Sequence, residues 1–238
     1  MRATRRTALL LPLLGALAAA GGWGPAGWGG AAAALTALAP PAAAAPQRPD
    51  PREAERLVRR TADRLLEILR QRKAELREHP ERLYELVREE VLPHFDFRRI
   101  ARWVLGKHWR RATPEQRRRF VEEFRRLLVR TYARSLLDYT EARLELLPSR
   151  PGSRPGRVTV RTRILPPGGG EPVPVDYAMR HGEGGWKVVD VRIGGVSLVA
   201  NYRASFASQI ASQGLERLLA ELAERNRRAG QTPEGAGG

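Results

Sequence analysis

The chain of 238 residues is 42% hydrophobic, enough for one domain with a real core, and it has no cysteine, which excludes disulfides, thiol catalysis and thiolate metal sites. Its formal net charge is +16 and almost every cation is arginine, because lysine occurs only at positions 73, 107 and 187. Since the charges are spread along predicted helix faces and no nucleic-acid-binding module is recognisable, we interpret them as compositional bias and expect no nucleic-acid partner. A basic surface is nevertheless attracted to anionic lipid headgroups.

The N-terminal part of the chain is typical of an exported protein. Basic residues precede an uncharged apolar run over residues 8–20, and small residues that permit cleavage occur at 18–20 and at 42–45. The run is too short to span a bilayer, although a retained N-terminal anchor is the alternative. Export of this kind predicts a periplasmic protein. The expected organisation is a signal peptide with a low-complexity leader at 1–45, one domain at 46–230 and a disordered tail at 231–238.

The first part of the predicted domain is mainly helical. Segments 51–78 and 81–92 each have an apolar side, and Ile100, Trp103 and Val104 follow the i, i+3, i+4 spacing of a helix. The apolar side of the first segment consists of Leu57, Ala62, Leu65, Leu66 and Leu69.

Thr113-Pro114-Glu115-Gln116 is the strongest local signal for a helix start. Thr113 can cap the helix, Pro114 suits its first position, and Gln116 can bond back to complete a capping box. The helix that begins here has an aromatic-rich apolar stripe, which is usually core but also permits a cavity. The stripe consists of Phe120, Phe124, Leu127, Leu128, Thr131, Tyr132, Leu136 and Tyr139.

Alternating apolar and polar residues predict an antiparallel sheet, interrupted by a loop of proline and glycine at 148–156. In the last strand we expect Val189, Val191 and Ile193 on the apolar face, because every second residue points the same way. The opposite face is then formed by Val188, Asp190 and Arg192. Helices before and after the sheet must cover this face, which predicts an α+β fold. The predicted strands are 141–147, 157–164, 173–179 and 185–193.

A tight turn joins the last strand to the next helix. Gly194 and Gly195 permit backbone conformations that a side chain would disfavour, and Ser197 is suited to cap the helix that follows. Leu198 and Tyr202 begin an i, i+4 apolar stripe on that helix. A strand and a helix joined so tightly must pack against each other.

No catalytic or metal-binding set is recognisable in the sequence. The four histidines lack metal-ligand spacing, and neither a phosphate-binding glycine loop nor a serine-nucleophile motif occurs. Asp176 and Asp190 could each act as a general base in an apolar pocket, but strand alternation places both on the outward face. We therefore expect no catalytic residue, no metal site and no enzyme. The alternative is a small enzyme, an isomerase or a hydrolase, with one of these acids as its base.

Five short segments carry the most specific signal in the chain. They are Phe95-Asp96-Phe97, Leu105-Gly106-Lys107-His108-Trp109, Phe120-x-x-x-Phe124-x-x-Leu127-Leu128-x-x-x-Tyr132, Gly185-Trp186-Lys187-Val188-Val189-Asp190-Val191 and Gly195-Val196-Ser197-Leu198-Val199-x-Asn201-Tyr202-Arg203-x-x-Phe206. In this order they resemble the MlaC, or toluene-tolerance, family of periplasmic phospholipid-binding proteins. The resemblance runs from about Ala54 to Leu222. One departure is Gly194, where the family more often has an acidic residue.

The resemblance implies an NTF2-like α+β fold, with a twisted antiparallel sheet of about four strands wrapped by helices around an apolar pocket for phospholipid. It implies a periplasmic shuttle that catalyses no reaction and has no cofactor apart from its phospholipid cargo. The implied partners are an outer-membrane lipoprotein–porin complex and an inner-membrane ABC transporter with an MCE-domain subunit, in a system that maintains outer-membrane lipid asymmetry. We also expect a monomer that contacts membrane surfaces transiently.

Within such a pocket, lipid should contact inward-facing residues of the sheet and of its covering helices. The predicted lipid-binding residues are Trp103, Val104, Phe120, Phe124, Leu128, Tyr132, Val160, Val175, Tyr177, Val189, Val191, Val196, Leu198 and Tyr202.

Overall fold

The structure is a computed structural model that describes residues 49–231. The predicted leader lies outside the described residues, as does the predicted tail apart from Gln231. The predicted boundaries of leader, domain and tail therefore stay predictions. The helical elements before the sheet are α1 (Pro51–Gln71), α2 (Lys73–Glu78), α3 (Pro80–Glu90), η1 (Leu92–His94), α4 (Phe97–Leu105), α5 (His108–Arg111), α6 (Pro114–Tyr132) and η2 (Arg134–Tyr139).

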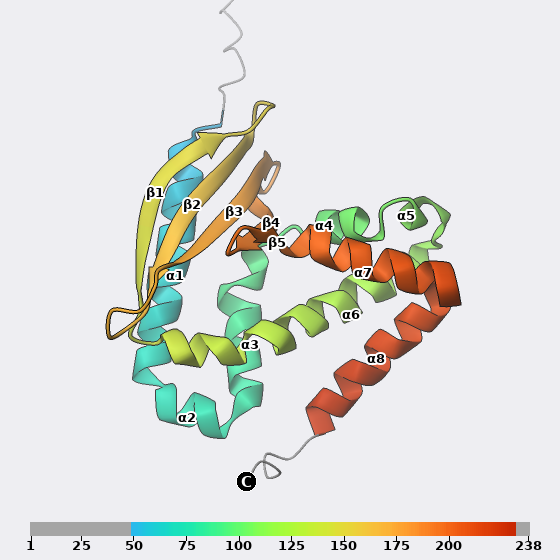
Figure 1. Cartoon of the computed structure of the whole chain (residues 1–238), viewed down its shortest axis with the longest axis horizontal. Helices are drawn as coiled ribbons and strands as arrows, with labels where there is room; N and C mark the ends of the chain where they lie inside the picture. Colours follow the sequence, from blue (N-terminus) through green and yellow to red (C-terminus); the bar gives the residue numbers. More distant parts are fainter. Residues whose placement is uncertain (1–48, 232–238) are drawn as a thin grey trace, which may run out of the picture. The chain divides into compact units, whose positions relative to one another are not determined.

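The sheet is an antiparallel meander in which each strand pairs with the next along the chain, in the order β1-β2-β3-β4-β5 (Figure 1). The expected α+β fold is confirmed, with one strand more than expected, because Val196–Ser197 adds two residues to the edge of β4. The strands are β1 (Arg143–Pro151), β2 (Arg157–Leu165), β3 (Val173–Gly182), β4 (Gly185–Ile193) and β5 (Val196–Ser197), and two helices follow, α7 (Leu198–Gln213) and α8 (Leu215–Gln231).

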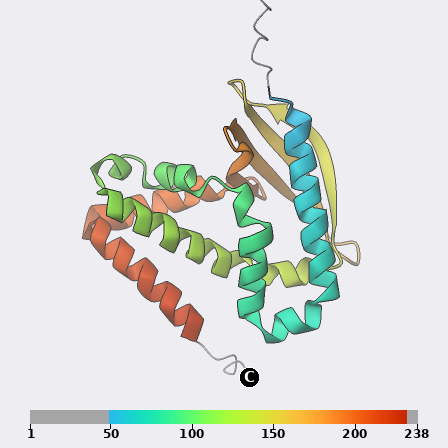
Figure 2. The ribbon, with the colours of Figure 1, turned by 180° about the vertical axis from the view of Figure 1, so that it is seen from behind.

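Helix α1 packs across one face of the sheet (Figure 2). Ala54 and Val58 of the helix are buried against apolar residues of three strands. The helix begins at a side-chain cap, since the Asp50 carboxylate accepts the backbone N–H of Arg52 at 2.9 Å. The strand residues buried under α1 are Val158, Val160, Met179, Trp186 and Val188.

A β-bulge changes the expected alternation in β4. Ala178 is paired with Asp190 and Met179 with Val188, so Val189 is an extra residue without an opposite partner. As a result Val188 and Val191 both join the apolar layer under α1. The expectation that Val188 lies on the opposite face from Val191 is therefore wrong, because the bulge shifts the alternation by one residue.

Strand β1 is longer than predicted. The proline- and glycine-rich stretch expected to form a loop from residue 148 continues as strand to Pro151. An irregularity between Leu147 and Arg150 absorbs an extra residue. Proline is tolerated there because β1 is an edge strand, where not every backbone group pairs within the sheet.

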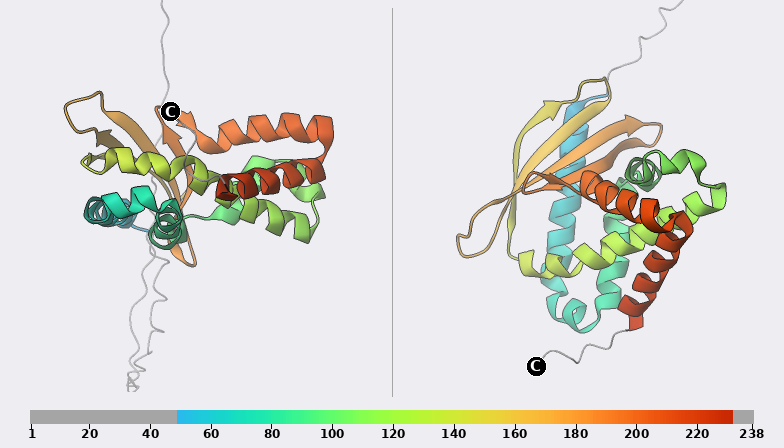
Figure 3. Two further views of the ribbon diagram at one scale, coloured as in Figure 1. Left: turned by 90° about the horizontal axis from the view of Figure 1, so that it is seen from below. Right: turned by 45° about the vertical axis from the view of Figure 1, so that its right-hand side comes forward.

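Helices α4 to α8 form a second apolar cluster beyond the β4–β5 edge of the sheet (Figures 1 and 3). The Phe120 and Phe124 rings stack at 5.5 Å, and both meet Phe206 of α7 edge-on. The predicted capping box is confirmed: Thr113 Oγ1 accepts Gln116 N–H at 3.1 Å, and Gln116 Oε1 accepts Thr113 N–H at 2.8 Å.

The turn between β4 and α7 also forms as expected. Gly194 and Gly195 have positive φ angles of 58° and 83°, which glycine adopts without strain. Ser197 caps α7, with its Oγ accepting the Ala200 N–H at 3.0 Å.

A third apolar cluster packs the end of α1 against α2, α3 and η2.

Candidate functional site

A small apolar cavity lies between α1, the η1 region and the sheet, with a volume of about 110 Å³. Most of its wall is aliphatic or aromatic, and the polar side chains in it are those of Thr61, His94 and Tyr177. A space lined in this way suits apolar groups with few polar fixtures. The lining residues are Leu57, Val58, Thr61, Ala62, Leu65, Val91, His94, Phe95, Tyr177, Met179 and Val188.

The segment that closes one side of the cavity is joined to the sheet. Phe95 bridges Val188, and the Asp96 N–H donates to the Val188 carbonyl at 3.0 Å. Asp96 also caps α4, because its Oδ1 accepts the Arg99 N–H at 2.9 Å. Lys187 Nζ donates to the Pro93 carbonyl at 2.6 Å. These contacts fix the position of Phe95 in the cavity wall.

Burial sets the protonation of the titratable groups in the wall. It raises the pKa of Tyr177 to about 12, so the phenol stays neutral. Burial also lowers the pKa of His94, and the positive charge of Lys187 lowers it further. The cavity is therefore electrically neutral around pH 7, which suits hydrocarbon better than charged substrates.

Of the predicted strand residues, one lines this cavity and two others belong to the apolar layer around it. Tyr177 lines it directly. Val160 and Val191 belong to the same apolar layer under α1. Val175 is buried and Val189 is the bulged residue, also buried.

The predicted helical residues gather elsewhere, mainly in the cluster of α4 to α8. Val104, Phe120 and Phe124 are buried there, and Leu128 and Tyr202 pack against them. Burial, followed by the effect of Tyr202 and a hydrogen bond with it, raises the pKa of Tyr132 to about 12. Trp103 and Leu198 are half-buried.

Val196 differs from its expected position. The sequence predicts it as an inward-facing lipid contact, yet 59% of its surface is exposed. That expectation of burial is wrong because Val196 belongs to β5, which extends the sheet edge past the turn. The contacts between β4 and the start of α7 are polar and partly buried: Asp190 accepts Ser197 Oγ–H at 2.7 Å and Val199 N–H at 3.1 Å.

Sequence reasoning missed most of the cavity wall. Val58 and Thr61 of α1, together with Val91, His94 and Phe95, were not among the predicted site residues. The signal for α1 was present, because the apolar side of segment 51–78 includes three lining residues. The apolar side of a helix shows that the helix packs against something, but it does not show against which element. The sequence therefore did not identify α1 as the helix that covers the sheet.

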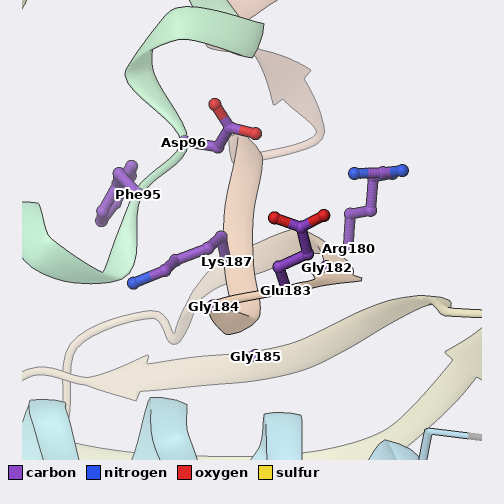
Figure 4. Close-up of a pocket in the computed structure, with 8 residues that line it drawn as sticks. All are labelled: Phe95, Asp96, Arg180, Gly182, Glu183, Gly184, Gly185 and Lys187. Carbon is purple, nitrogen blue, oxygen red and sulfur yellow. The ribbon is translucent and has the colours of Figure 1, made fainter.

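A second hollow, of about 500 Å³, lies beside the β3–β4 hairpin (Figure 4). Charged side chains of Asp96, Arg180, Glu183 and Lys187 line it. Such a lining suits water and ions better than acyl chains. The apolar cavity under α1 is therefore the better candidate for a hydrophobic ligand.

Within residues 49–231 no group of histidines and carboxylates is placed to hold a metal ion. Neither acid considered as a general base lines the apolar cavity: Asp190 bonds to the start of α7, and Asp176 lies opposite Arg161 and Arg192 in the sheet. Among the described helices, none is both long and apolar enough to cross a membrane.

Comparison with known proteins agrees with this architecture. The chain is 24% identical over 168 residues to the intermembrane phospholipid transport system binding protein MlaC of Haemophilus influenzae, covering 70% of this chain and 78% of the relative. It is 27% identical over 185 residues to the toluene tolerance protein ttg2D of Pseudomonas putida, covering 75% and 85%.

A solved structure is also similar. The phospholipid-binding protein from Ralstonia solanacearum, in complex with a phospholipid, superposes with a TM-score of 0.68 at 30% identity, covering 74% of this chain and 97% of the other. The sequence model of the family described as MlaC protein matches residues 59–224, which include every strand and most of the helices described above. The chain therefore belongs to the MlaC family.

Proposed function

We propose that this chain is a periplasmic phospholipid-binding protein that carries glycerophospholipid between the inner and outer membranes. The observation that carries the proposal is the neutral apolar cavity between α1 and the sheet. Similarity to a phospholipid-binding protein solved with a phospholipid supports it, because the likeness covers most of this chain. We infer that the acyl chains lie between α1 and the sheet and that the headgroup stays near solvent.

The energetics explain why such a protein encloses its cargo. Two acyl chains contain roughly 30 methylenes, and exposing each to water costs about 0.8 kcal/mol, so a free crossing would cost on the order of 20 kcal/mol. Shielding the chains removes most of this cost, whereas the hydrated headgroup needs no shelter. Apolar side chains packed around the acyl chains are then sufficient to carry a phospholipid through water.

The cavity must widen to accept a whole phospholipid. Its volume of about 110 Å³ is well below the ~300–1,000 Å³ typical of sites for drug-sized ligands. The wall is divided between α1, the η1 region and three residues of β3 and β4. We infer that α1 and the sheet separate when lipid binds.

The proposal extends to the partners of the protein. We infer transient, monomeric association with an inner-membrane ABC transporter that has an MCE-domain subunit, and with an outer-membrane lipoprotein–porin complex. Weak binding is required because a shuttle must leave each partner. Maintenance of outer-membrane lipid asymmetry is the role that follows from this placement.

We infer that the protein catalyses no reaction on the lipid. The competing proposal, a small enzyme with Asp176 or Asp190 as base, is less well supported. Asp190 already accepts two hydrogen bonds at the start of α7, and neither acid faces the apolar cavity.

Mass spectrometry of organic extracts of the purified protein tests the proposal. We expect near-stoichiometric phospholipid from the unmodified chain and much less from Ala62→Trp, because the added indole fills the cavity wall. Ala207→Trp is the matched control, since Ala207 is exposed on α7. Extracts without phospholipid from the unmodified protein, or equal phospholipid from the two folded variants, would refute the proposed site.

A further inference from the structure

A groove of about 520 Å³ lies on the opposite side of α4 from its buried residues, and cationic side chains dominate its wall. Besides Trp103, Gly106 and Trp109, its lining residues are six cations and no carboxylate. Helix α4, the turn before α5, the start of β2 and helix α7 all contribute. The cations are Arg99, Arg102, Lys107, Arg110, Arg157 and Arg203.

Most of these cations are not neutralised within the described part of the protein. Arg99 pairs with Asp96 at 3.1 Å, but no ion pair among residues 49–229 involves Arg102 or Arg203, nor the remaining three cations of the groove. Elsewhere arginines are paired with glutamates of the same helix, as Arg126 is with Glu122 at 3.1 Å. The groove therefore carries a concentrated and uncompensated positive charge.

One of these cations lies against a backbone turn. Gly106 has φ 54° and ψ −121°, a conformation that side-chain-bearing residues rarely adopt. A β-carbon at Gly106 would lie 3.3 Å from both Nε and Nη2 of Arg203. The Arg203 guanidinium of α7 thus lies against the α4–α5 turn, and a β-carbon at Gly106 would require it to shift by a few tenths of an ångström.

The positive charge continues onto the uncovered face of the sheet. Arg157 is in register with Arg180, and Arg180 with Lys187, so the three positions adjoin on β2, β3 and β4. The Lys187 side chain turns away from Arg180, because its Nζ donates to the Pro93 carbonyl at 2.6 Å. Like charges directly opposite each other are destabilising. Figure 4 shows Arg180 and Lys187 on the β3–β4 hairpin, with Glu183 of the same hairpin and Asp96 nearby.

We propose that this cationic groove docks the protein on an anionic bilayer surface. Headgroup phosphates supply closely spaced negative charges, and Lys and Arg near such a surface are attracted to it. Half-buried Trp103 lies among the cations, and tryptophan is favoured at the headgroup level of a bilayer. The occupant that we propose is therefore an anionic lipid surface, and an acidic protein face is the alternative that the test distinguishes. The inference does not depend on the lipid cavity, whose lining shares no residue with the groove.

The test is flotation of the purified protein with vesicles of phosphatidylcholine containing about a third phosphatidylglycerol. We expect the unmodified protein to bind these vesicles at low salt, to bind pure phosphatidylcholine far less, and to be released at high salt. The double variant Arg102→Gln/Arg203→Gln should bind about 25-fold more weakly, from roughly fivefold for each cation removed.

The matched control is Arg143→Gln/Arg225→Gln, which removes the same charge from exposed positions on β1 and α8. It should bind within about twofold of the unmodified protein, and both double variants should keep their co-purifying phospholipid, which separates this test from that of the cavity. Equal loss of vesicle binding in the two double variants would overturn the proposal. So would a groove variant that binds vesicles normally but fails to deliver lipid in cells, which would assign the groove to an acidic protein partner.

Discussion

His94 is the titratable side chain whose protonation most directly affects the apolar cavity. It lines the cavity, and burial lowers its pKa below the ordinary value of 6.5. The unfolded chain keeps an ordinary histidine pKa, so as the pH falls the unfolded state takes up the proton first. This group therefore contributes a loss of stability that begins as the pH falls through about 6.5.

We predict that the free energy of unfolding decreases from about pH 7 to about pH 5, and that His94→Asn makes this decrease smaller. Urea unfolding at several pH values measures it. Part of the decrease that persists in His94→Asn belongs to His108, whose pKa is also lowered by burial and by nearby cations. An unchanged pH dependence in His94→Asn would contradict the assignment.

At the scale of the element, side-chain caps determine where helices begin. Ser197 Oγ accepts a hydrogen bond from the Ala200 N–H, and the Asp190 carboxylate accepts hydrogen bonds from the Ser197 hydroxyl and the Val199 N–H. The three groups form one polar network at the start of α7. A carboxylate there is also favoured by the positive end of the helix dipole.

We predict that Ser197→Ala lowers the free energy of unfolding by about 1 kcal/mol and that Asp190→Ala lowers it by more, about 1–3 kcal/mol, because it leaves a partly buried hydroxyl and amide without their acceptor. Thr113→Ala, which removes the cap of α6, should resemble Ser197→Ala. Denaturant unfolding of the three variants compares them. If Asp190→Ala cost no more than Ser197→Ala, the carboxylate would not hold this network together.

Local signals in the sequence account for the elements that could be predicted. The capping box at Thr113, the glycine turn before Ser197 and the alternation in β2 each depend on neighbouring residues, and each is found in the structure. The bulge at Val189 could not be predicted, because consecutive valines fit either face of a strand equally well.

At the scale of the described domain, apolar residues form separate clusters with different roles. The sequence predicted a single pocket bounded by the sheet and the aromatic stripe of α6. In the structure Phe120 and Phe124 pack with α7 and α8, whereas α1 covers the sheet and lines the cavity. Periodicity identifies the apolar side of each helix but not its neighbour, so only Tyr177 of the predicted site residues lines the cavity.

Met179 offers the most direct test of the central claim, that phospholipid binds between α1 and the sheet. It lines the cavity, is 2% exposed, and is one of only two methionines in the chain, the other being Met1. Replacing methionine by its diazirine analogue therefore places a short-range photoreactive group in the cavity wall. As a control, Met179→Leu combined with Leu127→Met moves the probe to the cluster of α4 to α8, where Leu127 is buried.

The measurement is mass spectrometry of tryptic peptides after irradiation of the lipid-loaded protein. We predict a phospholipid adduct on the peptide of residues 164–180, which contains Met179, and none at position 127 in the control. Protein that carries phospholipid but forms its adduct at position 127 and not at Met179 would place the lipid among the helices and contradict the account.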